Sequence, residues 1–475
     1  MNTPELASEP LTWKASLLWL GLAVVCFNLA YASPAGSAAG LLMIGYALAL
    51  VNLTRQRSVR RAFYFGLAAG VCAYAPQLWF FWNIFHQAAV VLWVILAFWI
   101  GLFSAIVCGA ARRWGRPVAL WLIPVVWTGV EYFRSELYYL KFSWLNFGYV
   151  GIPGVNFFIK FGMYGEGFLI LALVTVLAHW RWFRQPQMKW WTGLILPGLA
   201  VFAVIAAFIC DLASAARYGS PNHPPLTLTG IQWEAPNNYT VVKSLDQAWK
   251  KHPDTRIFVL SEFTLEGTVP DNLKTWCRAH ACYLVVGGKD FVTNEVYYNT
   301  AFVVGTNGEI VFQQVKSVPI PLFKDGLPAP RQAVWDSPWG KIGIGICYDL
   351  GFTRVTDELI RQGAQLLIVP TMDVAEWGRH QHDLHARVAP VRAAEYGVPI
   401  FRLASSGISQ AVQGTGYVVA HTTFPGSGEV LTARLRLPLR GALPVDRWLA
   451  PLCVWVTGLI TVVLLWLTWR ERRPK

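Results

Sequence analysis

The segment Lys341-Ile-Gly-Ile-Gly-Ile-Cys347-Tyr348-Asp349 is a glycine-spaced apolar run that ends in a cysteine and a polar turn. Glu262 and Lys316 also stand at, or just beyond, the ends of apolar runs. A thiolate is an effective nucleophile, a carboxylate can take the thiol proton, and an ammonium group can stabilise an oxyanion. Together these three residues predict a cysteine acyl-transfer site.

Each of the three residues, taken alone, has an ordinary structural explanation. A cysteine at a strand end is commonly a buried core residue, and a carboxylate or a lysine there is commonly a solvated charge. Their order, their shared placement at strand ends and the chemistry of the set favour catalysis over these separate explanations.

The region around these residues, 222–436, alternates short β-rich runs with helical patterns, which predicts an α/β domain with helices covering a sheet. The predicted strands are 226–232, 256–261, 283–288, 301–304, 309–315, 341–347, 365–370, 399–403, 409–420 and 429–437. The predicted helices are 241–251, 271–280, 354–362 and 380–396.

The rest of the chain has the composition of a membrane protein. Of its 475 residues, 55% are hydrophobic and only 14% are charged, whereas soluble proteins carry about 25% charge. Eight apolar stretches approach the roughly 20 residues that cross a bilayer. They lie at about 14–32, 37–53, 62–82, 87–111, 117–133, 160–180, 191–211 and 447–468. We therefore expect a membrane domain at 1–215, a catalytic domain at 222–436 and a C-terminal transmembrane helix at 447–468.

The net charge of +13 comes from basic residues between alternate spans and after the last one. They are Arg55, Arg57, Arg60 and Arg61; Arg112, Arg113 and Arg116; Arg181, Arg184 and Lys189; and Arg470, Arg472, Arg473 and Lys475. This is the positive-inside pattern. It predicts that both termini are cytoplasmic and that residues 212–446 are extracytoplasmic, and it argues against a nucleic-acid partner.

Three cysteines fall in the predicted extracytoplasmic part. Cys277 and Cys282 either form a disulfide or remain two thiols, and the sequence leaves both options open. In either case Cys347 is left as an unpaired thiol.

Several motifs along nearly the whole chain resemble the apolipoprotein N-acyltransferase family of the nitrilase superfamily. They are Gly345-Ile-Cys347-Tyr-Asp349, Trp127-Thr-Gly-Val-Glu131-Tyr-Phe-Arg134, Ser143-Trp144-Leu-Asn-Phe-Gly148-Tyr149, Gly162-Met-Tyr164-Gly165, Tyr298-Asn299-Thr300, Gln381-His382, Arg392-Ala-Ala-Glu395-Tyr-Gly-Val-Pro399 and Ser406-Gly407. The resemblance implies a nitrilase-like α/β sandwich carried by about eight membrane helices. It also implies the triad Glu262, Lys316 and Cys347.

The resemblance further implies an activity. Cys347 takes an acyl chain from a membrane phospholipid as a thioester, and the N-terminal amine of a diacylglyceryl-cysteine lipoprotein then accepts it. The location implied is the bacterial inner membrane, with the catalytic domain on the periplasmic side. Two alternatives remain: a membrane-anchored amidase or hydrolase on the same scaffold, and a non-catalytic protein that binds lipid or lipoprotein.

The family's supporting glutamate after the lysine is not matched here. In an ungapped alignment Lys324 takes its position and Asp325 follows it, so either an extra cation enters the site or Asp325 compensates. The family's Ser-Asn-Asp segment is also changed, to Thr371-Met372-Asp373.

Further residues are expected around the site. The expected supporting residues are Asp325, Lys324, Tyr348, Asp349, Asn299, Glu395 and His382, and the expected lipid-entry residues are Trp127, Trp144 and Tyr149. His380, His382 and His385 lie close together, but no cysteine or well-placed carboxylate completes a zinc-type ligand set around them. The family also uses no metal, so neither a metal nor a cofactor is expected.

Overall fold

The computed structural model describes residues 10–34, 36–151, 161–178 and 225–472. The chain forms two compact units: a helical unit, Met1–Asp211 with Pro444–Lys475, and a sheet unit, Leu212–Leu443. The sheet unit is therefore inserted in the chain between two parts of the helical unit.

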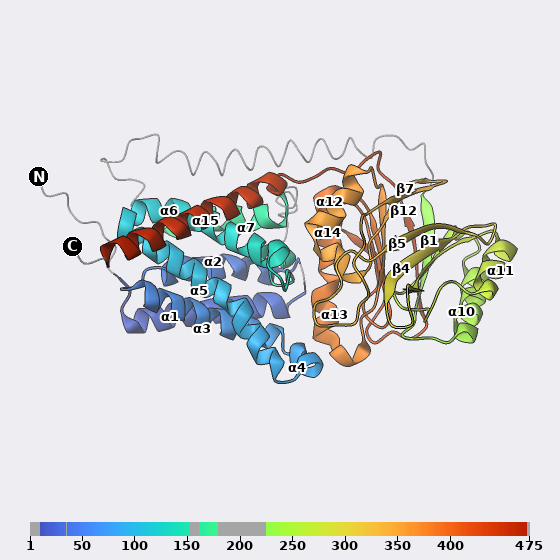
Figure 1. The fold of residues 1–475 in the computed structure, drawn as a ribbon, viewed down its shortest axis with the longest axis horizontal. Coiled ribbons are helices and arrows are strands. Elements are labelled where there is room, and N and C mark those ends of the chain that lie inside the picture. The colour runs from blue at the N-terminus through green and yellow to red at the C-terminus, as the bar shows by residue number, and fades with distance from the viewer. Residues whose placement is uncertain (1–9, 35, 152–160, 179–224, 473–475) are drawn as a thin grey trace, which may run out of the picture. The chain divides into compact units, whose positions relative to one another are not determined.

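The helical unit is a bundle of apolar helices (Figure 1). Its described α-helices are α1 (Trp13–Ala32), α2 (Leu42–Leu53), α3 (Val59–Gln77), α4 (Phe80–Phe85), α5 (Ala88–Trp114), α6 (Arg116–Tyr132), α7 (Met163–Ala178) and α15 (Asp446–Glu471). By length and composition, α1, α5 and α15 can cross a membrane, while Ala38–Leu53 and Met163–Ala178 are shorter apolar helices. Within the described residues, three helices are thus candidate spans, and the count of eight stays a prediction. The predicted span at 191–211 lies outside the described residues.

The predicted span at 62–82 is wrong as a single helix, because α3 ends at Gln77 and a short α4 follows. Pro76 has no N–H, so it cannot bond to the carbonyl four residues earlier, that of Cys72. Asn28 Nδ2 of α1 donates to this Cys72 carbonyl instead, at 3.1 Å. The helix therefore ends just after the proline, and its freed acceptor is satisfied by a neighbouring helix.

The C-terminal helix α15 packs closely against α6 at Gly129. A Cβ atom on Gly129 would lie 2.5 Å from the Cys453 carbonyl oxygen and 2.5 Å from Thr457 Oγ1. Only a residue without a side chain permits this approach. In apolar surroundings such small-residue contacts let helix backbones pack tightly.

We expect Gly129→Ala to destabilise the helical unit by about 1–3 kcal/mol, because the new methyl group overlaps backbone atoms of α15. Gly458→Ala is the matched control, since nothing lies within 4 Å of its added Cβ. Thermal unfolding of the detergent-solubilised protein, followed by tryptophan fluorescence, measures both. Equal midpoints for the two variants would contradict the packing described.

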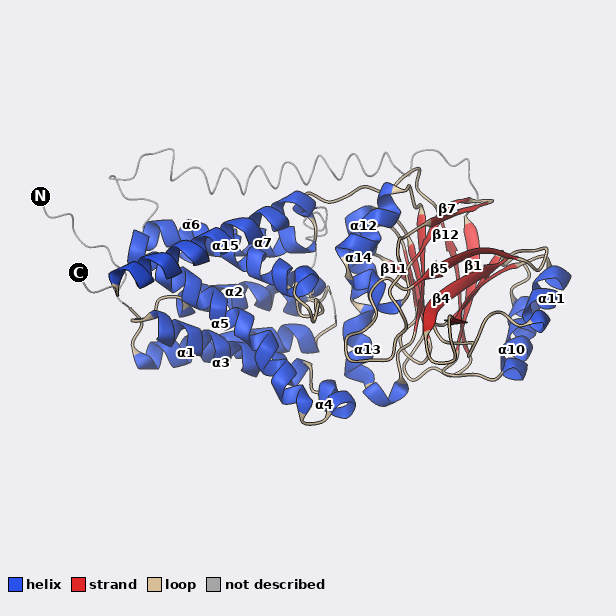
Figure 2. Cartoon of the chain, viewed as in Figure 1, coloured by secondary structure: helices blue, strands red, loops and turns tan. Residues whose placement is uncertain are grey.

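The sheet unit is a four-layer α/β sandwich of two sheets between two helical layers (Figure 2). One six-stranded sheet has the order β12 (Glu429–Leu435), β1 (Leu226–Gln232), β2 (Ile257–Leu260), β3 (Tyr283–Phe291), β4 (Tyr297–Val304), β5 (Ile310–Val315). The other has the order β11 (Val418–His421), β10 (Gln410–Val412), β9 (Ile400–Ala404), β8 (Leu366–Thr371), β7 (Gly340–Ile344), β6 (Val334–Ser337).

Helices cover the outer face of each sheet. The first sheet carries α10 (Asn238–Lys251) and α11 (Asp271–His280), and the second carries α12 (Thr353–Arg361), α13 (Arg379–Ala386) and α14 (Val388–Tyr396). Buried side chains such as Leu245, Phe258 and Trp276 join α10 and α11 to the first sheet. Burial of such apolar surface is the main stabilising term for a layered fold of this kind.

Strand direction gathers the reactive residues at one edge of each sheet. Strands β1, β2 and β3 run parallel, as do β7, β8 and β9. Strand β5 also runs in the direction of β3, because both pair antiparallel with β4. The carboxyl ends of β2 and β5 therefore lie at the same edge of the first sheet, which places Glu262 and Lys316 near each other.

Three sequence predictions for this unit need correction. The predicted helix at 380–396 is two helices, α13 and α14, and Pro390 lies in the first turn of the second, where a missing N–H is tolerated. The predicted strand at 409–420 is a hairpin of β10 and β11, and Gly416 adopts φ +84° in its turn. Strand β6 was not predicted, because Val334-Trp-Asp-Ser337 is a short edge segment.

Cys277 and Cys282 are both free thiols. Burial raises the pKa of Cys277 to about 12.

Candidate active site

A buried ion cluster centres on the Lys316 ammonium. Its Nζ lies 2.8 Å from Glu262 Oε1 and 2.7 Å from Asp325 Oδ2. All three side chains are almost completely buried. One ammonium group therefore faces two carboxylates. When both carboxylates are ionised, the three side chains together carry one net negative charge.

Asn299 and the loop after β5 hold the two carboxylates in place. Asn299 Nδ2 donates to Glu262 Oε1 at 2.6 Å and to Asp325 Oδ1 at 2.9 Å. The Ile320 N–H donates to Asp325 Oδ2 at 2.8 Å. Lys324 is exposed, and its backbone carbonyl accepts from Tyr297 OH at 2.7 Å. The carboxylate of Asp325 thus enters the cluster, and the Lys324 side chain does not add a cation to it.

Cys347 begins a short 3-10 helix, Cys347–Gly351, instead of ending the strand as predicted. Its φ of +50° lies in the left-handed region, so the thiol is carried on a sharp turn between β7 and the helix. The side chain is 3% exposed, which separates the thiol from bulk solvent.

Asp349 joins this turn to the segment that follows Lys316. Its carboxylate accepts N–H bonds from Ile346 at 3.1 Å, from Ser317 at 3.0 Å and from Val318 at 2.7 Å. The positions of the Cys347 turn and of the Lys316 segment are therefore coupled through one buried side chain.

The backbone of Met372 bridges Glu262 and Cys347. Its N–H donates to Glu262 Oε2 at 2.8 Å, and its carbonyl accepts from Cys347 Sγ at 3.8 Å. Glu262 therefore has Lys316 and Asn299 on one oxygen and a backbone N–H on the other, which fixes the plane of its carboxylate.

The electrostatics of the cluster keep the thiol protonated at rest. Burial, followed by the charge of Glu262, raises the pKa of Cys347 well above its usual value, and Lys316 opposes this only in part. Burial also raises the pKa of Glu262. For Lys316, burial alone would lower the pKa, but Glu262 and Asp325 raise it well above its usual value. A neutral thiol thus lies among groups that can accept its proton and stabilise negative charge.

Three further residues predicted to support the site, Tyr348, Glu395 and His382, have their own contacts in the sheet unit. The Tyr348 ring packs against Phe352, with centroids 4.8 Å apart. Glu395 binds Arg392 at 2.6 Å, and Arg392 in turn donates to the carbonyls of Leu350 and Gly351 at the end of the 3-10 helix that begins at Cys347. His382 is buried, and its Nδ1 lies 2.9 Å from the Gly378 carbonyl.

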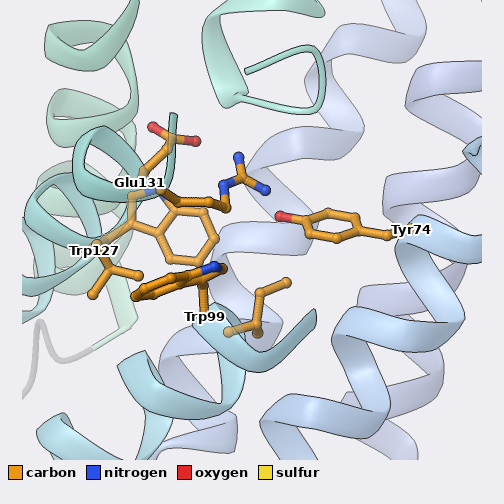
Figure 3. Close-up of a pocket in the computed structure, with 7 residues that line it drawn as sticks. Tyr74, Trp99, Trp127 and Glu131 are labelled. Carbon is orange, nitrogen blue, oxygen red and sulfur yellow. The ribbon is translucent and has the colours of Figure 1, made fainter. Parts of the chain in front are cut away.

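The residues predicted for lipid entry are all buried in the helical unit: Trp127, Trp144 and Tyr149. Trp127 lines a small pocket together with Tyr74, Trp99 and Glu131 (Figure 3). Glu131 also accepts the Phe147 N–H at 3.2 Å. The motif that carries Trp127 and Glu131 therefore contributes a buried carboxylate to the interior of the helical unit.

Sequence reasoning missed the Met372 backbone and the buried side chain of Asp373. Asp373 binds His385, Arg402 and Gln381. A usable signal was present, because Asp373 lies three residues beyond a predicted strand, in the segment Thr371-Met372-Asp373 that the resemblance marks as changed.

Two family models together cover most of the chain. The model described as "Apolipoprotein N-acyltransferase N-terminal domain" matches residues 15–176, and the model described as "Carbon-nitrogen hydrolase" matches residues 224–444. The apolipoprotein N-acyltransferase of Geobacter metallireducens is 25% identical over 441 residues, which cover 82% of this chain and 84% of that protein. The chain belongs to the apolipoprotein N-acyltransferase family.

Other relatives of this family match in the same way. The apolipoprotein N-acyltransferase of Chlamydia pneumoniae is 24% identical over 384 residues, 67% of this chain and 70% of that protein. Among solved structures, the carbon-nitrogen hydrolase from Helicobacter pylori G27 is 18% identical with a TM-score of 0.40, over 53% of this chain and 96% of that one.

The pKa of Asp349 gives a test in solution. Burial raises it to about 6, although Lys316 and the three N–H donors lower it. The value in an unfolded chain is about 3.9. This group therefore favours the folded state below pH about 4, and its contribution of roughly 3 kcal/mol is lost as the pH rises through about 6.

We expect the difference in thermal midpoint between the wild type and Asp349→Asn to change with pH: the midpoint of the wild type should decrease relative to that of the variant as the pH rises from 4 to 7. Asp271→Asn is the control, because the Asp271 side chain is 97% exposed. Midpoints that change in parallel for the wild type and Asp349→Asn would contradict the raised pKa.

Proposed function

We propose that this chain N-acylates lipoproteins, using a phospholipid as acyl donor and Cys347 as the nucleophile. The observation that carries the proposal is the position of the Cys347 thiol beside the buried Glu262–Lys316–Asp325 cluster, in a chain of this family. A buried thiol flanked by a base and a cation is suited to acyl transfer.

In the first half-reaction, Glu262 takes the thiol proton while Cys347 Sγ attacks the ester carbonyl of the phospholipid. Lys316 stabilises the oxyanion of the tetrahedral intermediate. When the intermediate collapses, the carbon–oxygen bond to the glycerol oxygen breaks and Glu262 returns its proton to that oxygen. The products are a thioester on Cys347 and a lysophospholipid.

In the second half-reaction, the α-amine of the diacylglyceryl-cysteine attacks the thioester carbonyl. Glu262 takes a proton from the amine, and the carbon–sulfur bond breaks as the amide forms. The proton then returns to Sγ, which restores the thiol. The near-complete burial of Cys347 favours aminolysis over hydrolysis, because it limits the access of water to the thioester.

Asp325 supplies the supporting carboxylate in this scheme. It shares the Lys316 ammonium with Glu262, so the ammonium cannot fully neutralise Glu262, and this helps Glu262 accept a proton. Asp349, Asn299, Tyr348, Glu395 and His382 support the site through the contacts described above.

The arrangement in the membrane is part of the proposal. Both termini are cytoplasmic and the sheet unit is periplasmic in this proposal, with helices crossing the bacterial inner membrane. The basic residues between alternate predicted spans support this orientation. The lipid donor and the lipoprotein acceptor would then both lie in the membrane that holds the enzyme.

The central test is formation of the acyl-enzyme. Purified protein incubated with phospholipid labelled in its acyl chain should acquire label that hydroxylamine releases, and a diacylglyceryl-cysteine peptide should then remove it as an amide. Cys347→Ala should acquire no label, because it lacks the sulfur that forms the thioester. Unchanged transfer by Cys347→Ala would refute the assignment, whereas labelling without aminolysis would identify a hydrolase.

The role of Asp325 is tested by comparing neighbouring residues. Asp325→Asn keeps the side-chain size but removes one carboxylate, so it should slow thioester formation by about 10-fold to 100-fold, within the range of acid–base effects. Lys324→Ala should leave the rate nearly unchanged, because the Lys324 side chain is exposed. A larger loss in Lys324→Ala than in Asp325→Asn would overturn the assignment.

Membrane orientation can be measured with thiol reagents that do not cross the inner membrane. Lys251→Cys on the exposed end of α10 should be labelled in intact cells, and Arg57→Cys between α2 and α3 should be labelled only after lysis. The reverse pattern would contradict the proposed topology.

A further inference from the structure

Asp373 is a buried carboxylate that the scheme above does not use. It lies two residues after the end of β8, the residue is completely buried, and it is adjacent in the chain to Met372. The backbone of Met372 contacts both the proposed base, through its N–H, and the proposed nucleophile, through its carbonyl. The groups that hold the Met372 backbone in place therefore help to set the positions of Glu262 and Cys347 relative to each other.

The carboxylate of Asp373 is held by three side chains. Oδ1 accepts from His385 Nδ1 at 2.8 Å and from Gln381 Nε2 at 3.0 Å, both on α13. Oδ2 accepts from Arg402 Nη2 on β9. Arg402 is itself fully buried, so the two charges neutralise each other away from solvent.

The backbone of Asp373 is held as firmly as its side chain. Its N–H donates to Ser405 Oγ at 3.0 Å. Its carbonyl accepts from Ser405 Oγ at 2.8 Å and also from Ser406 Oγ. The chain just after Met372 is thus fixed by α13 on one side and by β9 and the residues that follow it on the other.

We propose that Asp373 is a positioning residue of the acyl-transfer site. By anchoring the chain next to Met372, it directs the Met372 N–H at Glu262 Oε2 and the Met372 carbonyl at Cys347 Sγ. This inference rests on the proposed function, because it assigns Asp373 a part in orienting that base and that nucleophile.

The charge states agree with an anchoring role. Burial would raise the pKa of Asp373, but His385 and Arg402 hold it far below its usual range. Burial lowers the pKa of His385, and Arg402 adds to this effect, although Asp373 opposes it. Asp373 is therefore ionised and His385 neutral near neutral pH, so His385 donates its Nδ1 proton to Asp373 and neither group changes charge there.

Asp373→Asn keeps the shape of the side chain but cannot accept from all three donors. The Met372 peptide should then shift, and a displacement of about 1 Å at a reacting group can cost about 100-fold in rate. We expect kcat for thioester formation to fall by about 10-fold to 100-fold with little change in the KM for phospholipid.

A second readout depends on Glu262, which faces Lys316, Asp325 and Cys347. An N–H bond to a carboxylate favours its ionised form. Weakening the Met372 bond should therefore raise the pKa of Glu262 and move the acid limb of the rate profile to higher pH.

Two further variants separate positioning from stability. Asp373→Asn with Arg402→Gln removes the unpaired buried charge that could prevent folding, and it should keep the kinetic defect. Asp357→Asn is a matched control, because Asp357 is a buried carboxylate that accepts from Tyr396 OH at 2.7 Å, away from Met372. It should lower the thermal midpoint without moving kcat or the acid limb.

The inference is overturned if the wild type forms the thioester while both Asp373 variants keep its kcat and its acid limb. It is also overturned if Asp357→Asn shows the same kinetic defect at an equal loss of stability. A wild type that forms no thioester would instead refute the proposed function, and the role of Asp373 with it.

Discussion

The site in the sheet unit depends on neutralising one buried ammonium group. Moving an unpaired ammonium group such as that of Lys316 out of water is costly, and only nearby carboxylates and hydrogen bonds offset this cost. Glu262 follows β2, Lys316 follows β5, and Asp325 lies in the loop beyond. The cluster therefore forms only when these parts of the chain have folded together, which couples the chemistry of the site to the integrity of the first sheet.

The placement of the reactive residues was predictable because it depends on local patterns. Apolar runs of strand length ended next to Glu262 and Lys316, and parallel strands bring such ends to one edge. The choice between Lys324 and Asp325 was not predictable in this way. Leu322 and Gly326 adopt φ values of +72° and +83°, so the loop turns sharply on both sides of the pair. An ungapped alignment of letters carries no information about which side chain such a loop directs inward.

Other parts of the site were hidden for a different reason. The Met372 peptide acts through backbone atoms, so the identity of its side chain does not reveal it. The helix breaks near Pro76 and Pro390 also depend on where each proline falls within its turn. Hydrophobic periodicity locates a helical region well, but it does not decide whether the region is one helix or two.

The packing of α15 has a consequence for the order in which the chain can fold. This helix is encoded after the sheet unit, yet it packs at Gly129 against α6, which is encoded before that unit. The ribosome must therefore synthesise the entire sheet unit before the helical unit can complete its own packing. Until α15 has been made, the surface of α6 at Gly129 lacks this partner, so the nascent chain passes through a stage in which an apolar helix surface is uncovered.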